Sequence, residues 1–234
     1  MEKVIYVVWR DPATTIDALG QQLRLTLAPQ LKSLGVKSLR INVADAAVAA
    51  ATGIWQKHQT PPVEAIVQVW LDSAITLRRA PVDAAVAAVS ARHAAYLVTE
   101  SVPLPNTLHP ARHGLRTEGF AQVALFPHLA SISHEQFLQI WQESHTTVAI
   151  ETQSNFEYVQ NRVVRALTPG APEFHAIIEE SFPVGAMTDP QLFFDAAGDQ
   201  TKFNHNLKLM MDSVARFIDM ARIDVAPTSQ YLMF

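Results

Sequence analysis

Three residues at helical spacing in the second half of the chain, Phe137, Trp141 and His145, can place an imidazole beside an aromatic wall. Residues four apart lie on one face of a helix, so all three face whatever the helix covers. In an apolar cleft, burial lowers the pKa of His145, which leaves a neutral imidazole able to act as a general base near pH 7. A half-buried histidine bonded to the backbone is the alternative, and the residue types alone favour it.

A second set of candidates follows in the segment that contains Tyr158, Asn161 and Arg162. This segment predicts a strand, so Tyr158 and Asn161, three apart, point to opposite faces and only one of them can reach a cleft. Tyr158 would orient or protonate an enolate oxygen, whereas Asn161, which shares its face with valines, would hold a ligand carbonyl. Arg162 lies on the face of Tyr158 and joins them as a candidate binding residue.

Carboxylates and an imidazole mark a third predicted strand, which contains His175, Glu179 and Glu180. The two glutamates point to opposite faces, so one can be solvated while the other enters the interior. Alignment by strand position pairs Glu180 with Trp70 of the first half. An inward Glu180 near His145 would make an acid/base pair. The alternative is an edge strand whose charges prevent association, and the pattern favours that alternative.

Composition excludes several other chemistries. The chain of 234 residues has no cysteine, which removes disulfides, thiolate nucleophiles and thiolate metal sites. Its 8 glycines form no phosphate-binding motif, and a pair of histidines, His109 and His113, lies in a Pro- and Gly-containing segment that predicts a loop rather than a metal site. We therefore expect no metal ion.

Charge and hydropathy limit the partners and the location. The net charge is −4, without a basic block, so we expect no nucleic acid and no membrane as a partner. The N-terminal apolar run is of strand length and lacks the features of a signal peptide. These observations predict a cytoplasmic protein.

The secondary-structure elements that position the candidate residues are predicted to occur in the same order in both halves of the chain. In the first half we predict strands over 4–9, 36–43, 65–71 and 96–102, with a helix after Thr15 that ends near Gly35 and an Ala-rich helix that Asp72 or Ser73 can cap. In the second half we predict strands over 119–126, 156–164, 175–182 and 230–234. Helices are predicted from Ser133 to about 151, with a capping box, and over 201–220.

This order, β-α-β-β-α-β in each half, is ferredoxin-like and predicts an α+β fold. The predicted domains are residues 1–103 and 118–234, with 104–117 as the linker. Helices cover only one face of such a four-stranded sheet, so its other apolar face must be hidden, and the second copy can hide it. Two sheets facing each other form a barrel, with room for a ligand expected between them.

The second half also carries a family resemblance. The spacing of Phe137, Trp141 and His145, followed by the stretch from Tyr158 to Arg162, resembles the EthD family of dimeric α+β barrel proteins. The resemblance implies a ferredoxin-like barrel with an internal cleft for small apolar or aromatic compounds. It does not imply one reaction, because the fold determines the place of the site and not its chemistry.

The first half resembles the same family with two departures. Its stretch Leu27-Ala28-Pro29 resembles the family's His-Ala-Pro, with Leu27 in the histidine position, and Leu23 stands where the second half has Trp141. The segment from Val69 to Ser73 resembles the end of the family's third strand. If the histidine carries the chemistry, only the second half can perform it. We therefore expect one site per chain.

Taken together, these patterns predict an intrachain α+β barrel that binds a small hydrophobic or aromatic carbonyl compound. The expected reaction is proton transfer next to the carbonyl group, as in a decarboxylation, dehydration or isomerisation by a cofactor-free lyase or isomerase, because nothing in the sequence supplies electrons or a nucleophile. The candidate catalytic residues are His145, Tyr158 and Glu180, and the candidate substrate-binding residues are Trp141, Asn161, Arg162 and His175.

Two alternatives stay open. Some relatives in the wider superfamily act on oxygen or bind haem, so the barrel could be an oxidoreductase with His145 as an axial haem ligand. It could also be a binding protein without catalytic activity. Whether the chain forms a homo-oligomer beyond its internal pair is left open by the sequence.

Overall fold

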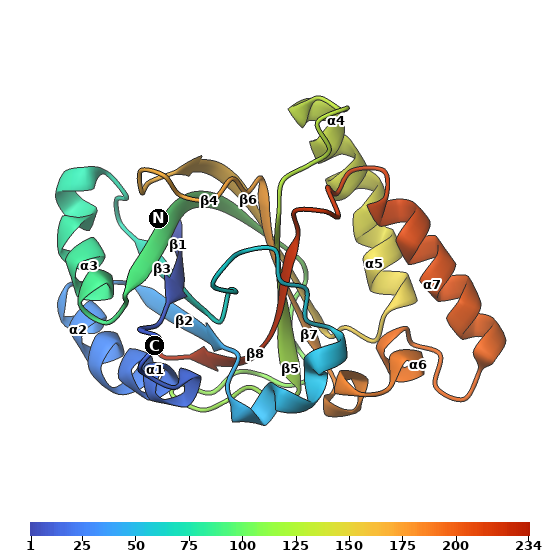
Figure 1. The fold of residues 1–234 in the computed structure, drawn as a ribbon, viewed down its shortest axis with the longest axis horizontal. Helices are drawn as coiled ribbons and strands as arrows, with labels where there is room; N and C mark the ends of the chain where they lie inside the picture. Colours follow the sequence, from blue (N-terminus) through green and yellow to red (C-terminus); the bar gives the residue numbers. More distant parts are fainter.

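Eight antiparallel strands form one closed barrel in the computed structural model, which describes residues 1–234 (Figure 1). Their order around the barrel is β1-β3-β2-β8-β5-β7-β6-β4. The strands are β1 (Glu2–Trp9), β2 (Ser38–Val43), β3 (Ala65–Leu71), β4 (Arg92–Leu104), β5 (Phe120–Phe126), β6 (Glu157–Ala166), β7 (Ala176–Phe182) and β8 (Asp224–Leu232).

The two halves of the chain contribute adjacent sets of four strands with the same order. The first half gives β4-β1-β3-β2 and the second gives β8-β5-β7-β6, and the sets are joined by pairing of β2 with β8 and of β4 with β6. The edge strands of each sheet therefore pair with those of the other, and the barrel has no unpaired edge strand. The predicted α+β barrel built from two ferredoxin-like units is confirmed. The division into domains stays a prediction, with residues 105–119 connecting β4 to β5.

Helices cover the outside of the barrel in two groups, α1 to α3 on one side and α4, α5 and α7 on the other (Figure 1). The α-helices are α1 (Ile16–Gln22), α2 (Ala28–Ser33), α3 (Thr76–Ala88), α4 (His134–Leu138), α5 (Thr146–Thr152), α6 (Pro190–Phe193) and α7 (Gln200–Val214). The π-helical segments are η1 (Leu23–Leu27) and η3 (Gln139–His145), and the 3₁₀ segments are η2 (Ala46–Gly53) and η4 (Val184–Met187).

Local signals set most of the predicted boundaries. Ser133 and Gln136 form the predicted capping box at the start of α4, and Gly35 follows α2 with the positive φ of 84° that glycine adopts without strain. The predicted cap of α3 was wrong, since Ile75 precedes the first turn and offers no side-chain bond. The last strand begins at Asp224 instead of residue 230, because pairing with β5 on one side and β2 on the other overrides the turn-like Pro227.

Both long helices contain a π turn at the corresponding place. In the second half, the backbone N–H of Thr146 bonds the carbonyl of Trp141, five residues earlier, and the Thr146 hydroxyl donates to the same oxygen at 3.0 Å. In the first half, the N–H of Ala28 bonds the carbonyl of Leu23 in the same way. Each π turn inserts one extra residue into the helix, which changes the face that the following residues present.

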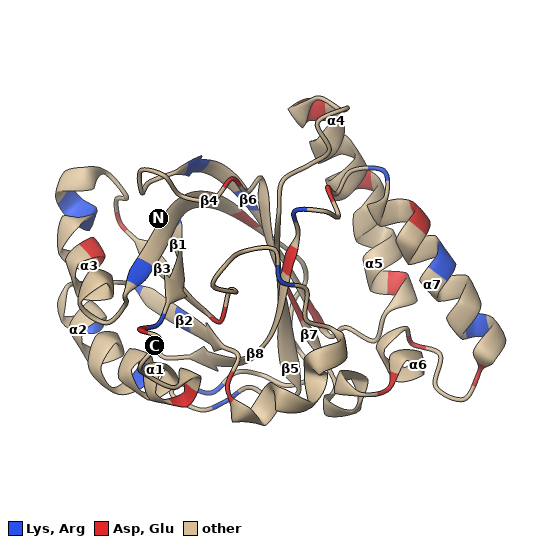
Figure 2. Cartoon of the chain, viewed as in Figure 1, with Lys and Arg blue, Asp and Glu red and all other residues tan.

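The interior of the barrel holds a network of charged and amide side chains beside a cluster of 12 buried apolar residues that includes Ile5 and Ile177. The Arg40 guanidinium on β2 bonds a carboxylate oxygen of Glu179 on β7 at 2.9 Å and one of Glu157 on β6 at 3.2 Å. Gln230 on β8 donates to both carboxylates at 2.8 Å. These contacts cross the barrel from one half to the other, and charged residues accordingly lie on the strands as well as on the outer helices (Figure 2).

None of the helices combines the length and the apolarity that crossing a bilayer requires.

The network makes the barrel sensitive to the loss of Arg40. In the variant Arg40→Met, two buried carboxylates lose their cation, and we expect the free energy of unfolding to fall by about 3–5 kcal/mol. The deficit should be smaller at pH 5 than at pH 8, because carboxylates can take up protons when no cation compensates them. Urea unfolding followed by tryptophan fluorescence measures both values.

The control is Arg78→Met, which removes an exposed arginine of α3 that makes no ion pair. Its stability should change by no more than about 0.5 kcal/mol. An Arg40→Met protein as stable as this control would show that the barrel does not depend on the cation.

Candidate active site

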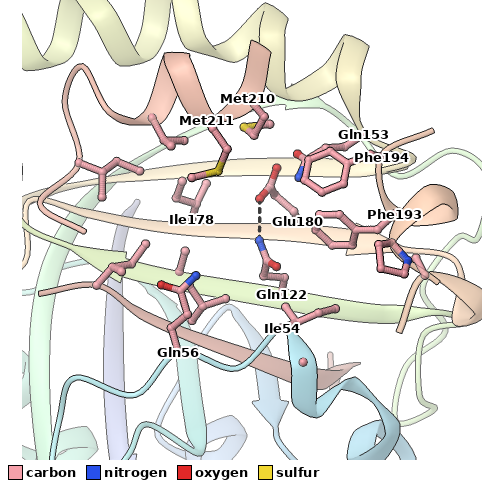
Figure 3. Close-up of a pocket in the computed structure, with 18 of the residues that line it drawn as sticks. Ile54, Gln56, Gln122, Gln153, Ile178, Glu180, Phe193, Phe194, Met210 and Met211 are labelled. Atoms are coloured by element: carbon pink, nitrogen blue, oxygen red, sulfur yellow. Dashed lines mark hydrogen bonds between the residues drawn. The ribbon is translucent and has the colours of Figure 1, made fainter. Parts of the chain in front are cut away.

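The main cavity lies outside the barrel, between the second-half sheet and the helices that cover it, and has a volume of about 540 Å³ (Figure 3). Its floor is the outer face of β5, β7 and β8, and its other walls come from α6, α7 and the 3₁₀ segment η2. Of the 24 lining residues 16 are hydrophobic, so the cavity suits an apolar ligand. The polar or ionisable side chains on its surface are those of Gln56, Gln122, His145, Gln153, Glu180 and Thr188.

This position corrects the expectation of a ligand site between the two sheets. The side chains that point into the barrel pack against one another. Polar ones meet across it, as Arg40 and Glu179 do, and apolar ones such as Ile5 and Ile177 form a buried cluster beside them. The open space lies instead between the helices and the sheet of the second half, where the side chains leave a cavity.

Glu180 is the ionisable acid of the cavity and points into it from β7 (Figure 3). It is 6% exposed, and its two carboxyl oxygens accept hydrogen bonds from the amides of Gln122 at 3.3 Å and Asn155 at 3.2 Å. Burial raises the pKa of Glu180 to about 7, against the lowering effect of the two amides. A carboxyl group with this pKa is divided between its protonated and ionised forms at neutral pH.

The neighbouring Glu179 differs from Glu180 because it contacts a cation as well as amide donors. Burial alone would raise the pKa of Glu179, but the Arg40 guanidinium and the amide donors, Asn42 at 2.7 Å and Gln68 at 2.9 Å among them, hold it below its ordinary range. The predicted opposite orientation of the two glutamates is confirmed. The edge-strand alternative was wrong, because β7 lies between β5 and β6. One strand thus carries an ionised carboxylate inward and a titrating carboxyl group outward.

His145 reaches the same cavity from the end of the π turn η3 and is 3% exposed. Its Nδ1 lies 2.9 Å from the Ser213 hydroxyl of α7, and its ring contacts Phe217 edge to face. Burial, followed by the charge of Arg216, lowers the pKa of His145 to about 4. The imidazole is therefore neutral at pH 7, as the sequence predicted, but it is a weaker base than the prediction required.

The first half has no counterpart of the polar pair formed by Gln122 and Glu180. Strands β3 and β7 have equal lengths and pair with β1 and β5, respectively. At the position where Gln122 of β5 pairs with Glu180 of β7, Val4 of β1 pairs with Val69 of β3. The sequence alignment of Glu180 with Trp70 was therefore wrong by one residue, which on a strand means the opposite face. Val4 and Val69 belong to a filled core of 23 buried apolar residues, compared with 13 in the cluster beside the cavity.

Trp141 and Tyr158 lie behind the wall of the cavity instead of on its surface. Both are fully buried, and the Trp141 indole donates to the Tyr158 hydroxyl at 3.2 Å. Gln160 donates to the same hydroxyl at 3.3 Å, and burial raises the pKa of Tyr158 further above its ordinary value. The pair supports the helix that carries His145.

The structure separates the remaining candidates from the cavity. Asn161 points into the barrel, where its amide donates to the Ile177 carbonyl at 3.0 Å, and Arg162 lies partly exposed on the other face of β6. His175 stacks on His128 with ring centroids 4.2 Å apart, near His134 and Phe137. Of the seven candidates, Glu180 and His145 share the cavity.

Sequence reasoning missed several residues of the cavity, foremost Gln122, Gln153, Met210 and Met211. Gln122 carried a usable signal, since it is a polar residue on the otherwise apolar outer face of the segment from Phe120 to Phe126. Gln153 carried none. It is 8% exposed, and its side-chain oxygen has no hydrogen-bond partner in the protein.

The lining residues do not fit a haem. The two carboxylates of a haem require cationic or hydrogen-bonding partners, and the cavity contains no lysine or arginine, while its acid Glu180 would repel them. No group of three or more His, Asp or Glu side chains is arranged to hold a metal ion.

No family model and no curated protein matches the sequence, so the resemblance to EthD stays a prediction. The chain is similar to solved structures of low sequence identity. An anthrone oxidase-like protein matches 99% of this chain and 93% of its own with a TM-score of 0.59 and 8% identity. A monooxygenase-like protein from Fusobacterium nucleatum matches 100% and 92% with a TM-score of 0.50 and 9% identity. These similarities establish the fold alone, a closed α+β barrel.

The raised pKa of Glu180 makes stability depend on pH. Below its unfolded pKa of 4.5 the group is protonated in both states, and between 4.5 and about 7 only the folded protein keeps the proton. The stability that protonated Glu180 contributes to the parent is thus lost as the pH rises through 7. Relative to the parent, the free energy of unfolding of Glu180→Gln should therefore rise by about 3 kcal/mol between pH 4.5 and pH 8. Urea unfolding at both pH values measures the gain.

The matched control is Glu151→Gln, which alters an exposed carboxylate of α5. Its stability relative to the parent should stay constant over the same range. A constant difference for Glu180→Gln as well would mean that Glu180 titrates normally in the folded protein.

Proposed function

We propose that the protein catalyses cofactor-free proton transfer next to the carbonyl group of a small apolar or aromatic compound. The observation that carries the proposal is Glu180, a buried carboxyl group with a pKa of about 7 that points into an apolar cavity. General bases are most effective when their pKa lies near the working pH, because they are then both ionised and basic. Such a group in a cleft is a candidate functional residue on physical grounds.

The walls of the cavity support the class of ligand. A volume of about 540 Å³ is in the range of small-molecule sites. Phe193 and Phe194 line the cavity near Glu180 and offer aromatic contacts, and Met210 and Met211 of α7 line the side that this helix covers (Figure 3). Methionine side chains adapt to ligands of differing outline. The cavity suits a flat apolar molecule with one polar end.

In the proposed step, ionised Glu180 removes a proton from the carbon next to the carbonyl group. The electron pair of the broken C–H bond forms the enolate, whose oxygen carries the negative charge. Hydrogen-bond donors at that oxygen would lower the barrier, and the amide of Gln153 and the neutral imidazole of His145 are among the donors that line the cavity. Return of the proton at another carbon completes an isomerisation. In a dehydration, the enolate expels a hydroxyl group from the neighbouring carbon as the C–O bond breaks, and the proton taken up by Glu180 converts it to water.

The proposal gives the proton transfer to Glu180 and a supporting role to His145. A base whose conjugate acid has a pKa of about 4 draws a carbon-bound proton only weakly, whereas its neutral ring can still donate a hydrogen bond. Arg216 donates to the Ser213 hydroxyl at 3.0 Å, which leaves the hydroxyl proton free to bond Nδ1 of His145. In that arrangement the ring proton lies on Nε2.

The oxidoreductase alternative begins with the same step, because an enolate is oxidised more readily than the ketone from which it forms. An anthrone is an aromatic ketone, and the description of one similar structure as anthrone oxidase-like supports the proposed ligand class. Oxygen consumption would separate oxidation from proton transfer alone.

Exchange of carbon-bound protons in heavy water tests the proposal. We expect the protein to accelerate deuterium incorporation next to the carbonyl group of 2-tetralone, a neutral fused-ring ketone, as followed by proton NMR. The variant Glu180→Gln should lower the rate by about 100-fold or more, in line with the loss of a general base. An oxygen electrode on the same samples tests the oxidoreductase alternative.

Glu151→Gln should exchange 2-tetralone at the parent rate. If the parent binds the ketone but leaves its protons in place, the protein is a binding protein and the proposal fails. Equal exchange by the parent and Glu180→Gln would assign the base to another residue.

The pH dependence of the exchange provides a separate check. Because kcat/KM reports the ionisation of the free enzyme, it should rise with pH and level off above an apparent pKa of about 7. A profile that levels off near 4 would instead assign the base to His145.

A further inference from the structure

The cavity contains one acidic side chain and no cationic one. No lysine or arginine is among the residues that line it, and His145 is held neutral by burial. The carboxyl oxygens of Glu180 are bonded by the uncharged amides of Gln122 and Asn155. A second negative charge bound here would meet a like charge and no counter-ion.

The chain keeps its buried cations elsewhere. Arg40 lies between Glu157 and Glu179 inside the barrel, and Lys3, with a pKa lowered by burial to about 8, bonds Glu100 at 2.7 Å. Strand β7 separates these groups from the cavity, since Glu179 points inward and Glu180 outward. The uncompensated state of Glu180 is therefore a property of the cavity and not of the whole protein.

Few titratable groups face Glu180 from the elements around it. Strand β6 presents Tyr158, which is opposite Glu180 in the sheet and stays protonated, and the helix η3 presents His145. Strand β5 presents the amide of Gln122. The lining residues from η2, α6, α7 and β8 carry no ionisable side chain. Protonation of Glu180 is thus the means by which this site can adjust its charge.

We propose that the cavity selects uncharged carbonyl compounds over carboxylates and takes up a proton at Glu180 when such a compound binds. The inference rests on the proposed function and narrows it, because decarboxylation would require a carboxylate substrate. Dehydration and isomerisation of neutral compounds remain.

Two physical effects produce the proton uptake. A bound apolar ligand displaces water from the carboxyl group, which favours its neutral form. The protonated carboxyl group can also donate a hydrogen bond to the ligand carbonyl, which the ionised form cannot do. The proton transfer is then carried out by the fraction of the complex in which Glu180 is ionised, so kcat should level off at a higher pH than kcat/KM does. A carboxylate ligand can accept the same hydrogen bond, but it brings a second negative charge whose desolvation no cation of the cavity compensates.

Two probes of nearly equal shape test the selection, the neutral ketone 2-acetylnaphthalene and the carboxylate 2-naphthoate. Titration calorimetry of the intact protein at pH 7.5 should show the ketone binding about 100-fold or more tightly than the carboxylate. Repeating the ketone titration in buffers of different ionisation enthalpy should show uptake of roughly half a proton or more per ligand.

The variant Glu180→Gln separates charge from shape. It should bind the ketone without proton uptake and bind 2-naphthoate at least about tenfold more tightly than the parent does, since the like charge is gone. Glu151→Gln should reproduce the parent in both respects. These measurements need binding and not turnover.

Equal or tighter binding of 2-naphthoate by the parent, or ketone binding without proton uptake, would overturn the inference while leaving the proposed proton transfer intact. If neither probe binds but 2-tetralone is exchanged, the selection for neutral ligands of this shape is also wrong. If no ketone binds or exchanges, the proposed function itself fails.

Discussion

The contact of Arg40 with Glu157 and Glu179 is the constraint on which the rest of the structure depends. It joins strands of the two halves across the barrel, at 3.2 and 2.9 Å, with Asn42, Gln68 and Gln230 saturating the remaining carboxylate oxygens. A buried ion network of this kind specifies how the two sheets face each other, because any shift would leave a carboxylate unpaired. Together with the buried apolar cluster that includes Ile5 and Ile177, it occupies the interior of the barrel, and the cavity lies outside.

Strand β7 contributes both to the ion network inside the barrel and to the cavity outside it. Its inward residue Glu179 meets a cation and amide donors, while its outward residue Glu180 meets amides alone. The alternation of side chains along a strand thus places an ionised and a titrating carboxyl group one residue apart. Neighbouring carboxyl groups with separated pKa values are the usual arrangement when one is structural and the other is available for proton transfer.

The two halves share a scaffold but use it differently. Both long helices contain a π turn, and both sheets have the same strand order. In the first half, Leu27, Val4 and Val69 fill the space between helix and sheet. In the second half, His145, Gln122 and Glu180 stand at the corresponding positions, and the space stays open. Filled packing on one side stabilises a barrel that carries a cavity on the other.

The sequence by itself determined the elements, their order and the faces of their side chains, because periodicity, caps and turns act between residues close in the chain. It therefore predicted the α+β barrel and the opposite orientations of Glu179 and Glu180, and its seven candidate residues included His145 and Glu180. Only the tertiary structure decided that the cavity lies outside the barrel, that Arg40 neutralises Glu179 and that Glu180 stays without a cation. A pKa depends on distant parts of the chain brought close by folding, such as residues 40 and 179, and no local pattern records them.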